Sequence, residues 1–258
     1  MDATKGKRRL GGAKRGYRFL LQSLNQLLWP AVCINCGESI YETDDNLCKD
    51  CWEKLLGCAA GDYCRRCGRD VSIYALLEGA CPDCQGRQFH FDQIARSGLY
   101  AQSLRDMILA FKNDRTELDP NLGFLANAAL QGSSFVNDIE LFVPVPLHWR
   151  RRLTRGYNQS LVLAKKLNHR SAKINTDLVR IRYTKSQTTL TSATQRAVNV
   201  SGAFAVRRGH QFAGRSVCLV DDIKTTGATL NECAKTLKEA GASKVFALVL
   251  AVAGQRNP

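Results

Sequence analysis

Blocks of apolar residues near the end of the chain predict strands and a helix in turn. Two short and largely apolar runs, at residues 216–220 and 245–252, are typical of buried strands. Between them, apolar residues recur at helical spacing from residue 230 to residue 237, and Gly241 ends the predicted helix. This order favours a parallel sheet, with a ligand site at the carboxyl end of the first strand.

The first of these strands runs directly into the sequence DDIKTTGATL, which begins with Asp221 and Asp222. A junction of strand, loop and helix offers free backbone N–H groups and the positive end of a helix dipole, which suit a phosphate group. Paired carboxylates suit sugar hydroxyls or a magnesium ion. The sequence therefore predicts a site for a phosphorylated sugar. The alternative is an acidic turn that caps an ordinary surface helix.

A second polar block follows another predicted strand, at residues 141–146. The sequence HWRRRLTRGYNQS has four arginines in six positions and leads into a predicted helix at residues 160–167. Guanidinium groups bind phosphate oxygens bidentately, so the block predicts a loop that clamps a polyanion. A solvated basic loop is the alternative. Lys112, at the end of an apolar helix face, is expected to be an exposed helix-end lysine; the alternative is that it reaches the site.

The Asp-Asp block resembles the signature of type I phosphoribosyltransferases, which bind 5-phosphoribosyl-1-pyrophosphate (PRPP). The resemblance implies that Asp221 and Asp222 hold the ribose at the catalytic centre. It implies a phosphate loop made of Lys224, Thr225, Thr226, Gly227, Ala228 and Thr229. It further implies a pyrophosphate loop with Arg152, Arg155 and Gly156, assisted by magnesium. A polar hood over residues 185–199 is expected to close on the ligand; the candidates for ligand contact are Arg182, Gln187, Arg196 and Asn199.

Eight of the eleven cysteines form four Cys-x-x-Cys pairs, which are typical of structural zinc sites. The pairs are Cys33 and Cys36, Cys48 and Cys51, Cys64 and Cys67, and Cys81 and Cys84. Sequential pairing predicts two zinc ions, the first four cysteines on one and the last four on the other. A crossed pairing stays open. Disulfides or free thiols are the alternatives, and disulfides require an oxidising compartment.

Several segments together resemble the ComF family of competence-associated proteins. They are VPVPLHWRRRLTRGYNQS, residues 100–112, 182–190 and 196–204, and the cysteine-rich N-terminal part. The resemblance implies a PRPP-binding domain linked to DNA uptake, with partners in the competence machinery. It leaves the reaction open. One reading is transfer of phosphoribosyl to an unknown acceptor with release of pyrophosphate. The other is a non-catalytic factor that senses PRPP or handles single-stranded DNA.

The predicted fold class is therefore α/β: a type I phosphoribosyltransferase-like parallel sheet flanked by helices, preceded by a small zinc-ribbon module. Residues 1–30 are expected to form a basic tail and an amphipathic helix, residues 31–88 the zinc module and residues 89–258 the phosphoribosyltransferase-like domain. The amphipathic helix either packs on the zinc module or lies on a membrane surface. No apolar run is long enough to span a membrane and no export cleavage site is evident, so a cytoplasmic protein is expected.

The net charge of +14 indicates a polyanionic partner besides PRPP. Single-stranded nucleic acid is the expected class, because basic grooves with stacking aromatic rings bind it without sequence preference. The aromatic residues that lie among basic ones are Trp52, Trp149, Tyr157 and Tyr183.

Overall fold

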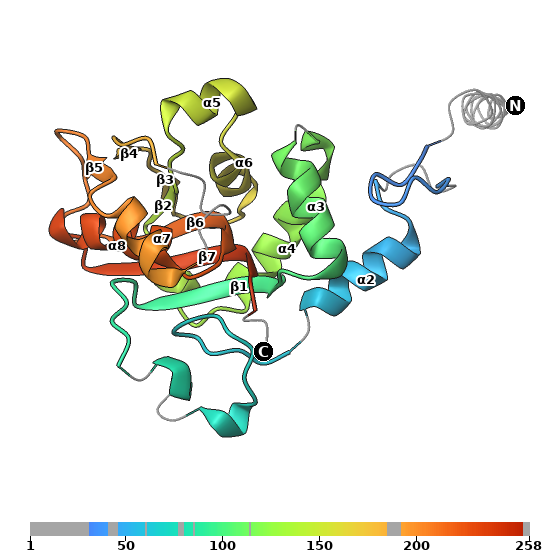
Figure 1. Ribbon diagram of the computed structural model, residues 1–258, viewed down its shortest axis with the longest axis horizontal. Coiled ribbons are helices and arrows are strands. Elements are labelled where there is room, and N and C mark those ends of the chain that lie inside the picture. The colour runs from blue at the N-terminus through green and yellow to red at the C-terminus, as the bar shows by residue number, and fades with distance from the viewer. Residues whose placement is uncertain are drawn as a thin grey trace, which may run out of the picture. The chain divides into compact units, whose positions relative to one another are not determined.

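The computed structural model describes residues 31–40, 46–59, 61–76, 80–84, 86–113, 115–184 and 192–254 (Figure 1). The tail and helix expected at residues 1–30 lie outside the described residues, and so does Gln187. The chain divides into two compact units, of which the first ends at Trp52 and the second begins at Glu53. The domain boundaries predicted from the sequence, after residues 30 and 88, stay a prediction.

The described elements follow the α/β order that the sequence predicts. The helices are α2 (Lys49–Ala59), α3 (Gln102–Lys112), α4 (Asp119–Gln131), α5 (Trp149–Arg155), α6 (Gln159–Lys166), α7 (Ala193–Val200) and α8 (Ala228–Glu239). The strands are β1 (Gln93–Leu99), β2 (Leu141–Pro144), β3 (Lys173–Ile174), β4 (Leu178–Arg180), β5 (Phe204–Val206), β6 (Ser216–Lys224) and β7 (Lys244–Val252). Single 3₁₀ turns lie at Ile73–Ala75, Pro82–Cys84, Thr116–Leu118 and Val136–Asp138.

Five strands form one parallel sheet in the order β1-β7-β6-β2-β3, and β4 and β5 form a separate antiparallel pair. The strands β1, β7 and β6 run side by side in Figure 1. The predicted parallel sheet flanked by helices is confirmed. Since all five strands point the same way, their carboxyl ends share one edge of the sheet, which is where ligands bind in open α/β sheets.

The main core lies between the sheet and α8. Alternate residues of β6 and β7, such as Val217, Leu219 and Val245, pack with the apolar face of α8 that the sequence predicts. The helices α4 and α6 pack on the strands β1, β7, β6 and β2, while their own buried residues lie outside this core. Both faces of the central strands are thus covered, which explains why β6 and β7 are apolar throughout.

Two segments differ from the expected irregular loops. The basic segment after β2 forms the short helix α5, and His148 caps it by accepting a hydrogen bond from the backbone N–H of Arg150 at 3.3 Å. Half of the expected hood forms α7, because Ser192 and Gln195 make a reciprocal capping box at its start. Residues 185–191, the other part of the hood, lie outside the described residues.

No described helix combines the length and the apolar composition needed to cross a membrane.

Candidate active site and metal centres

A small hollow opens where β6 passes into α8. It is lined by Asp221, Ile223, Lys224, Thr225, Thr226, Gly227, Ala228, Thr229 and Leu230. Gly227 caps α8 with a left-handed backbone, at φ +85°, which a residue with a side chain adopts only under strain. The Thr226 hydroxyl accepts the N–H of Ala228 at 3.3 Å. The turn therefore surrounds a small concave space at the N-terminus of a twelve-residue helix.

The structure extends β6 through the two predicted acidic residues and ends it at Lys224. Asp221 accepts hydrogen bonds from the Ser160 hydroxyl at 3.0 Å and from the backbone N–H of Asp222 at 2.9 Å. Burial raises the pKa of Asp221 to about 7, the neighbouring Asp222 raises it too, and the hydrogen bonds and Lys112 oppose that rise. Near neutral pH this carboxyl group is therefore poised between its neutral and charged forms.

Lys112 is not the exposed helix-end lysine that the sequence predicts. Its ammonium lies 2.9 Å from Asp222, and the two side chains are only 21% and 13% exposed. The last turn of α3 is held in place by Tyr157, whose hydroxyl donates to the carbonyl oxygen of Phe111. Helix α3 thus delivers a cation to an acidic pair that lies more than a hundred residues further along the chain.

Lys224 was expected on the phosphate loop, but it is the last residue of β6 and its side chain is 6% exposed. All members of the expected phosphate loop, Lys224 included, line the hollow. Lys224 thus lines the hollow as a buried residue at the end of the strand, and the loop residues that follow it complete the lining.

The basic residues after β2 do not line this hollow. Arg152 is exposed and Arg155 half-buried on α5, and Gly156 ends that helix at φ +72°. Their expected contact with pyrophosphate stays a prediction. The next helix, α6, does reach the acidic pair, because the Ser160 hydroxyl at its start donates to Asp221.

Little in the sequence points to Arg180, which the structure places near the acidic pair. Burial lowers the pKa of Arg180, and Arg151 lowers it as well, whereas Cys233 and Asp221 raise it. One of its terminal nitrogens donates to the Thr184 hydroxyl, and Arg151 donates to the carbonyl oxygen of Thr184 at 2.8 Å. Arg180 thus brings a further guanidinium group near Asp221, and Arg151 shares its partner residue Thr184. No short motif surrounds Arg180 that could have predicted this.

The expected ligand contacts of the hood are spread over two elements. Arg182 donates to the carbonyl oxygen of Ser201 at 2.6 Å and so joins the end of β4 to the end of α7. Arg196 and Asn199 are half-buried on α7. Gly202 donates to Glu232 of α8 at 2.6 Å, which holds the base of this segment near the hollow. Their roles toward a ligand stay predictions.

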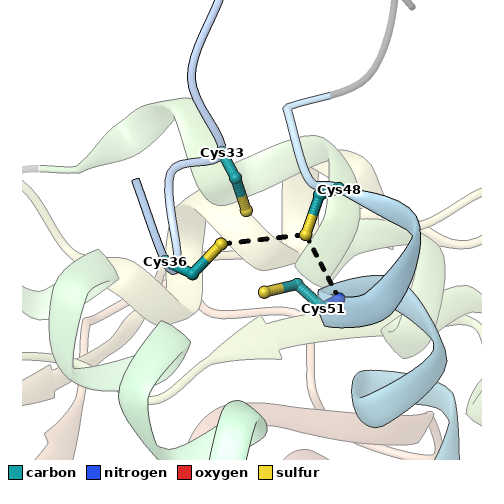
Figure 2. Close-up of side chains that lie close together, drawn as sticks. All are labelled: Cys33, Cys36, Cys48 and Cys51. Carbon is teal, nitrogen blue, oxygen red and sulfur yellow. Dashed lines mark hydrogen bonds between the residues drawn. The ribbon is translucent and has the colours of Figure 1, made fainter. Parts of the chain in front are cut away.

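The first four cysteines converge in the N-terminal unit (Figure 2). The sulfurs of Cys33, Cys36, Cys48 and Cys51 all lie within 4.8 Å of one another, and those of Cys36 and Cys48 are 3.7 Å apart. Four ligands at about 2.3 Å from one zinc ion stand about 3.8 Å apart in a tetrahedron, so this spacing fits zinc. The backbone N–H of Cys51 points to the Cys48 sulfur at 3.5 Å, as Figure 2 shows.

The last four cysteines form a second, fully buried cluster in the other unit. The Cys64 and Cys84 sulfurs are 3.7 Å apart, and Cys81 lies 3.6 Å from both Cys67 and Cys84. The same tetrahedral spacing applies. Both clusters follow the sequential pairing, and the crossed alternative is excluded for these residues.

Two known protein families match the chain, one over the cysteine clusters and one over the hollow. The double zinc ribbon domain family matches residues 24–85, and the phosphoribosyl transferase domain family matches residues 155–257. Competence protein F of Haemophilus influenzae is 30% identical over 220 residues, covering 83% of this chain and 93% of that protein. The chain belongs to the ComF family.

Other relatives are similar in sequence to this ComF protein over most of its length. Competence protein ComFC of Bacillus subtilis is 26% identical over 211 residues, which cover 78% of the chain and 82% of the relative. DNA utilization protein YhgH of Escherichia coli K12 is 30% identical over 188 residues, which cover 70% and 80%. This ComF protein therefore combines two four-cysteine zinc-binding sites in a double zinc ribbon with a phosphoribosyltransferase domain.

Proposed function

We propose that this protein binds PRPP at the junction of β6 and α8. The observation that carries the proposal is the hollow itself, in which the residues from Thr225 to Thr229 surround a small space beside Asp221. The 5′-phosphate would accept hydrogen bonds from the backbone amides of these residues at the positive end of α8. The ribose hydroxyls would donate to Asp221 and Asp222.

Magnesium fits the acidic pair as a partner of the bound ligand. The ion prefers oxygen ligands and is commonly held by one or two carboxylates together with substrate phosphates and water. Asp221 and Asp222 supply such carboxylates, and Lys112 already balances their charge at 2.9 Å from Asp222. When bound, magnesium would neutralise part of the charge on the pyrophosphate group.

The reaction that suits this ligand is displacement at C1 of the ribose. A nitrogen of the acceptor would form the new bond to C1 while pyrophosphate leaves with the electron pair of the old C1–O bond, and the acceptor would lose a proton. Positive charge develops on the ribose ring in such a step. The carboxylates at the ribose, and the guanidinium groups of Arg152 and Arg155 on the departing pyrophosphate, would act by position and charge.

Calorimetry with PRPP and magnesium tests the pocket. We expect the double variant Asp221→Asn/Asp222→Asn to weaken PRPP binding by at least about tenfold, because each lost acceptor to a bound hydroxyl costs about 1 kcal/mol. Asp138→Asn, which removes an exposed carboxylate paired with Lys244, is the matched control and should bind like the parent. Unchanged affinity in a double variant that keeps both zinc ions would refute the pocket.

Release of pyrophosphate separates an enzyme from a sensor. With saturating PRPP and magnesium, the parent protein would be offered nucleobases, nucleotides and short DNA strands in turn, and pyrophosphate would be measured by a coupled assay. Release above the acceptor-free rate, lost in the Asp221→Asn/Asp222→Asn variant, supports phosphoribosyl transfer. Tight PRPP binding without release for any acceptor supports the alternative, a non-catalytic PRPP sensor.

A second function, the handling of single-stranded nucleic acid, is favoured by an exposed group at α5. Trp149 and Tyr183 are 59% and 56% exposed, and the Arg150 guanidinium lies 5.3 Å and 5.6 Å from their ring centroids. Stacking rings with a cation between them suit unpaired bases. Tyr157, by contrast, is tied to α3, and Trp52 belongs to the other unit.

The names of the relatives, which refer to competence and DNA utilization, support a role in DNA uptake. We infer that the protein acts on incoming single strands in the cytoplasm, alongside proteins of the competence machinery. Thiols that serve as zinc ligands are compatible with a reducing compartment.

Fluorescence anisotropy with a labelled oligothymidylate tests this second function. We expect Trp149→Ala/Tyr183→Ala to lower the affinity by about tenfold or more, since each stacked base is worth about 1–3 kcal/mol. Phe124→Ala, which removes an aromatic ring of 55% exposure from α4, is the control. Parent affinity that stays constant as the salt concentration rises would contradict a phosphate-binding surface.

A further inference from the structure

The buried lysine at the end of β6 supports the phosphate loop from within. Gly227 lies so close to Lys224 that an added Cβ would stand 2.9 Å from its Cε and 3.6 Å from its Nζ. Lys224 also lines the hollow at the end of the strand. The turn that faces the ligand therefore rests directly on the aliphatic part and the ammonium of this side chain.

The Lys224 ammonium is a cation in a buried residue. Within the described part of the chain no ion pair involves it, although its side chain is only 6% exposed. A charge removed from water in this way needs compensation. A group of opposite charge close to the ammonium would supply that compensation.

The second cysteine cluster supplies groups of the required sign. Burial lowers the pKa of Lys224, the thiols of Cys67 and Cys84 raise it, and Arg69 and Arg87 lower it. Four thiolates on one Zn²⁺ carry a net charge of about −2. Both the cluster and Lys224 belong to the same compact unit.

Packing contacts join the cluster to the same strand end. Gly68 directly follows Cys67 and turns with φ +77°, and a Cβ on it would stand 2.9 Å from a methyl group of Val252. Val252 is the register partner of Lys224 between β7 and β6. The next residue, Ala253, donates its N–H to the Lys224 carbonyl oxygen at 2.8 Å.

We propose that the second zinc cluster is the counter-charge of Lys224 and thereby a supporting part of the phosphate loop. The knuckle at Cys67, the end of β7 and Lys224 form one continuous stack beneath Gly227. Zinc at this cluster orders the loop, and the lysine in turn stabilises the zinc, because such a coupling is reciprocal. Lys224 is a positioning residue here. The inference rests on the proposed function only for the identity of the ligand.

Zinc retention tests the pair directly. The zinc-loaded protein would be titrated with the chromogenic chelator 4-(2-pyridylazo)resorcinol, and the two zinc ions counted as they are released. We expect Lys224→Met to lose one zinc at a chelator concentration at least about fivefold lower than the parent, while the other is retained normally. Lys224→Arg, which keeps the charge, should restore most of the retention. Lys235→Met, on the exposed side of α8, is the control.

Hydrogen–deuterium exchange gives a second readout that needs no ligand. Peptides that cover residues 222–230 should exchange faster in Lys224→Met and also in the parent once the zinc of the second cluster is removed. Peptides from β2 and α4 should be unchanged, which shows that the domain stays folded. Normal retention of both zinc ions in Lys224→Met, or an unchanged loop after the second cluster is emptied, would overturn the proposal.

The outcome separates the two proposals. A parent protein that fails to bind PRPP refutes the proposed function, yet zinc retention and loop exchange still decide the role of Lys224. A parent that binds PRPP while Lys224→Met changes neither readout refutes the coupling alone.

Discussion

The ion pair between Lys112 and Asp222 gives a prediction that depends on the three-dimensional structure, because the two residues are far apart in the sequence. Their charged atoms are 2.9 Å apart. At an effective dielectric constant of about 20, Coulomb's law gives an attraction of about 6 kcal/mol. Removing two largely buried groups from water offsets most of it. We expect a net coupling of about 1.5–3 kcal/mol, more than an exposed pair supplies.

A double-mutant cycle measures this coupling. Lys112→Met should lower the free energy of unfolding by about 2–3 kcal/mol, since it leaves Asp222 unpaired beside Asp221. Adding Asp222→Asn should recover most of that loss, because the uncompensated charge disappears. Urea unfolding of the zinc-loaded protein, followed by far-UV circular dichroism, gives the free energies for all four proteins.

Lys235→Met serves as the reference for an exposed pair. Lys235 and Glu239 are 3.9 Å apart and 47% and 64% exposed. Lys235→Met should lower the free energy of unfolding by less than about 0.5 kcal/mol. A Lys112–Asp222 coupling as small as this reference would show that the lysine merely rests near the acidic pair, and it would refute the electrostatic reasoning.

Two further sets of measurements test the site. Since burial raises the pKa of Asp221 to about 7, its proton stabilises the fold fully below about pH 4, and this contribution is lost as the pH rises through about 7. The affinity for PRPP with magnesium should rise over the upper part of that range in calorimetry, and Ser160→Ala, which removes a donor to Asp221, should move the midpoint to higher pH. Gly227→Ala should cost about 2 kcal/mol or more in thermal unfolding, from its φ of +85° and the contact with Lys224, whereas Gly156→Ala, at φ +72° with open space around it, should cost only about 1 kcal/mol.

The parts of the site that lie within a short stretch of sequence could be predicted. The apolar strand, the Asp pair, the glycine turn and the helix from Ala228 follow one another within about two dozen residues, so local patterns determine them. The zinc ligands could also be predicted from the sequence, because each Cys-x-x-Cys pair is a local knuckle. Their pairing needed the structure.

Two segments that are expected to be loops contain local sequence signals for helices. Ser192 followed by Gln195 is the pattern of a capping box, and it predicts the start of α7 inside the expected hood. The helix α5 had a weaker signal: its cap is His148, an uncommon residue at that position, and its one leucine, Leu153, is exposed. Helical periodicity of apolar residues could not reveal a helix that buries none.

The remaining contacts depend on how the sheet is assembled. Lys112 follows β1, Ser160 follows β2, and the acidic pair ends β6, so these groups belong to three separate segments of sequence. Parallel strands bring the segments that follow them to one edge of the sheet, where Asp221 meets Ser160 and Asp222 meets Lys112. The end of β7 lies at the same edge, and there Val252 meets the turn after Cys67. A zinc ribbon that packs at this edge is therefore placed to influence the phosphate loop, although a reader of the sequence would assign the two to separate modules.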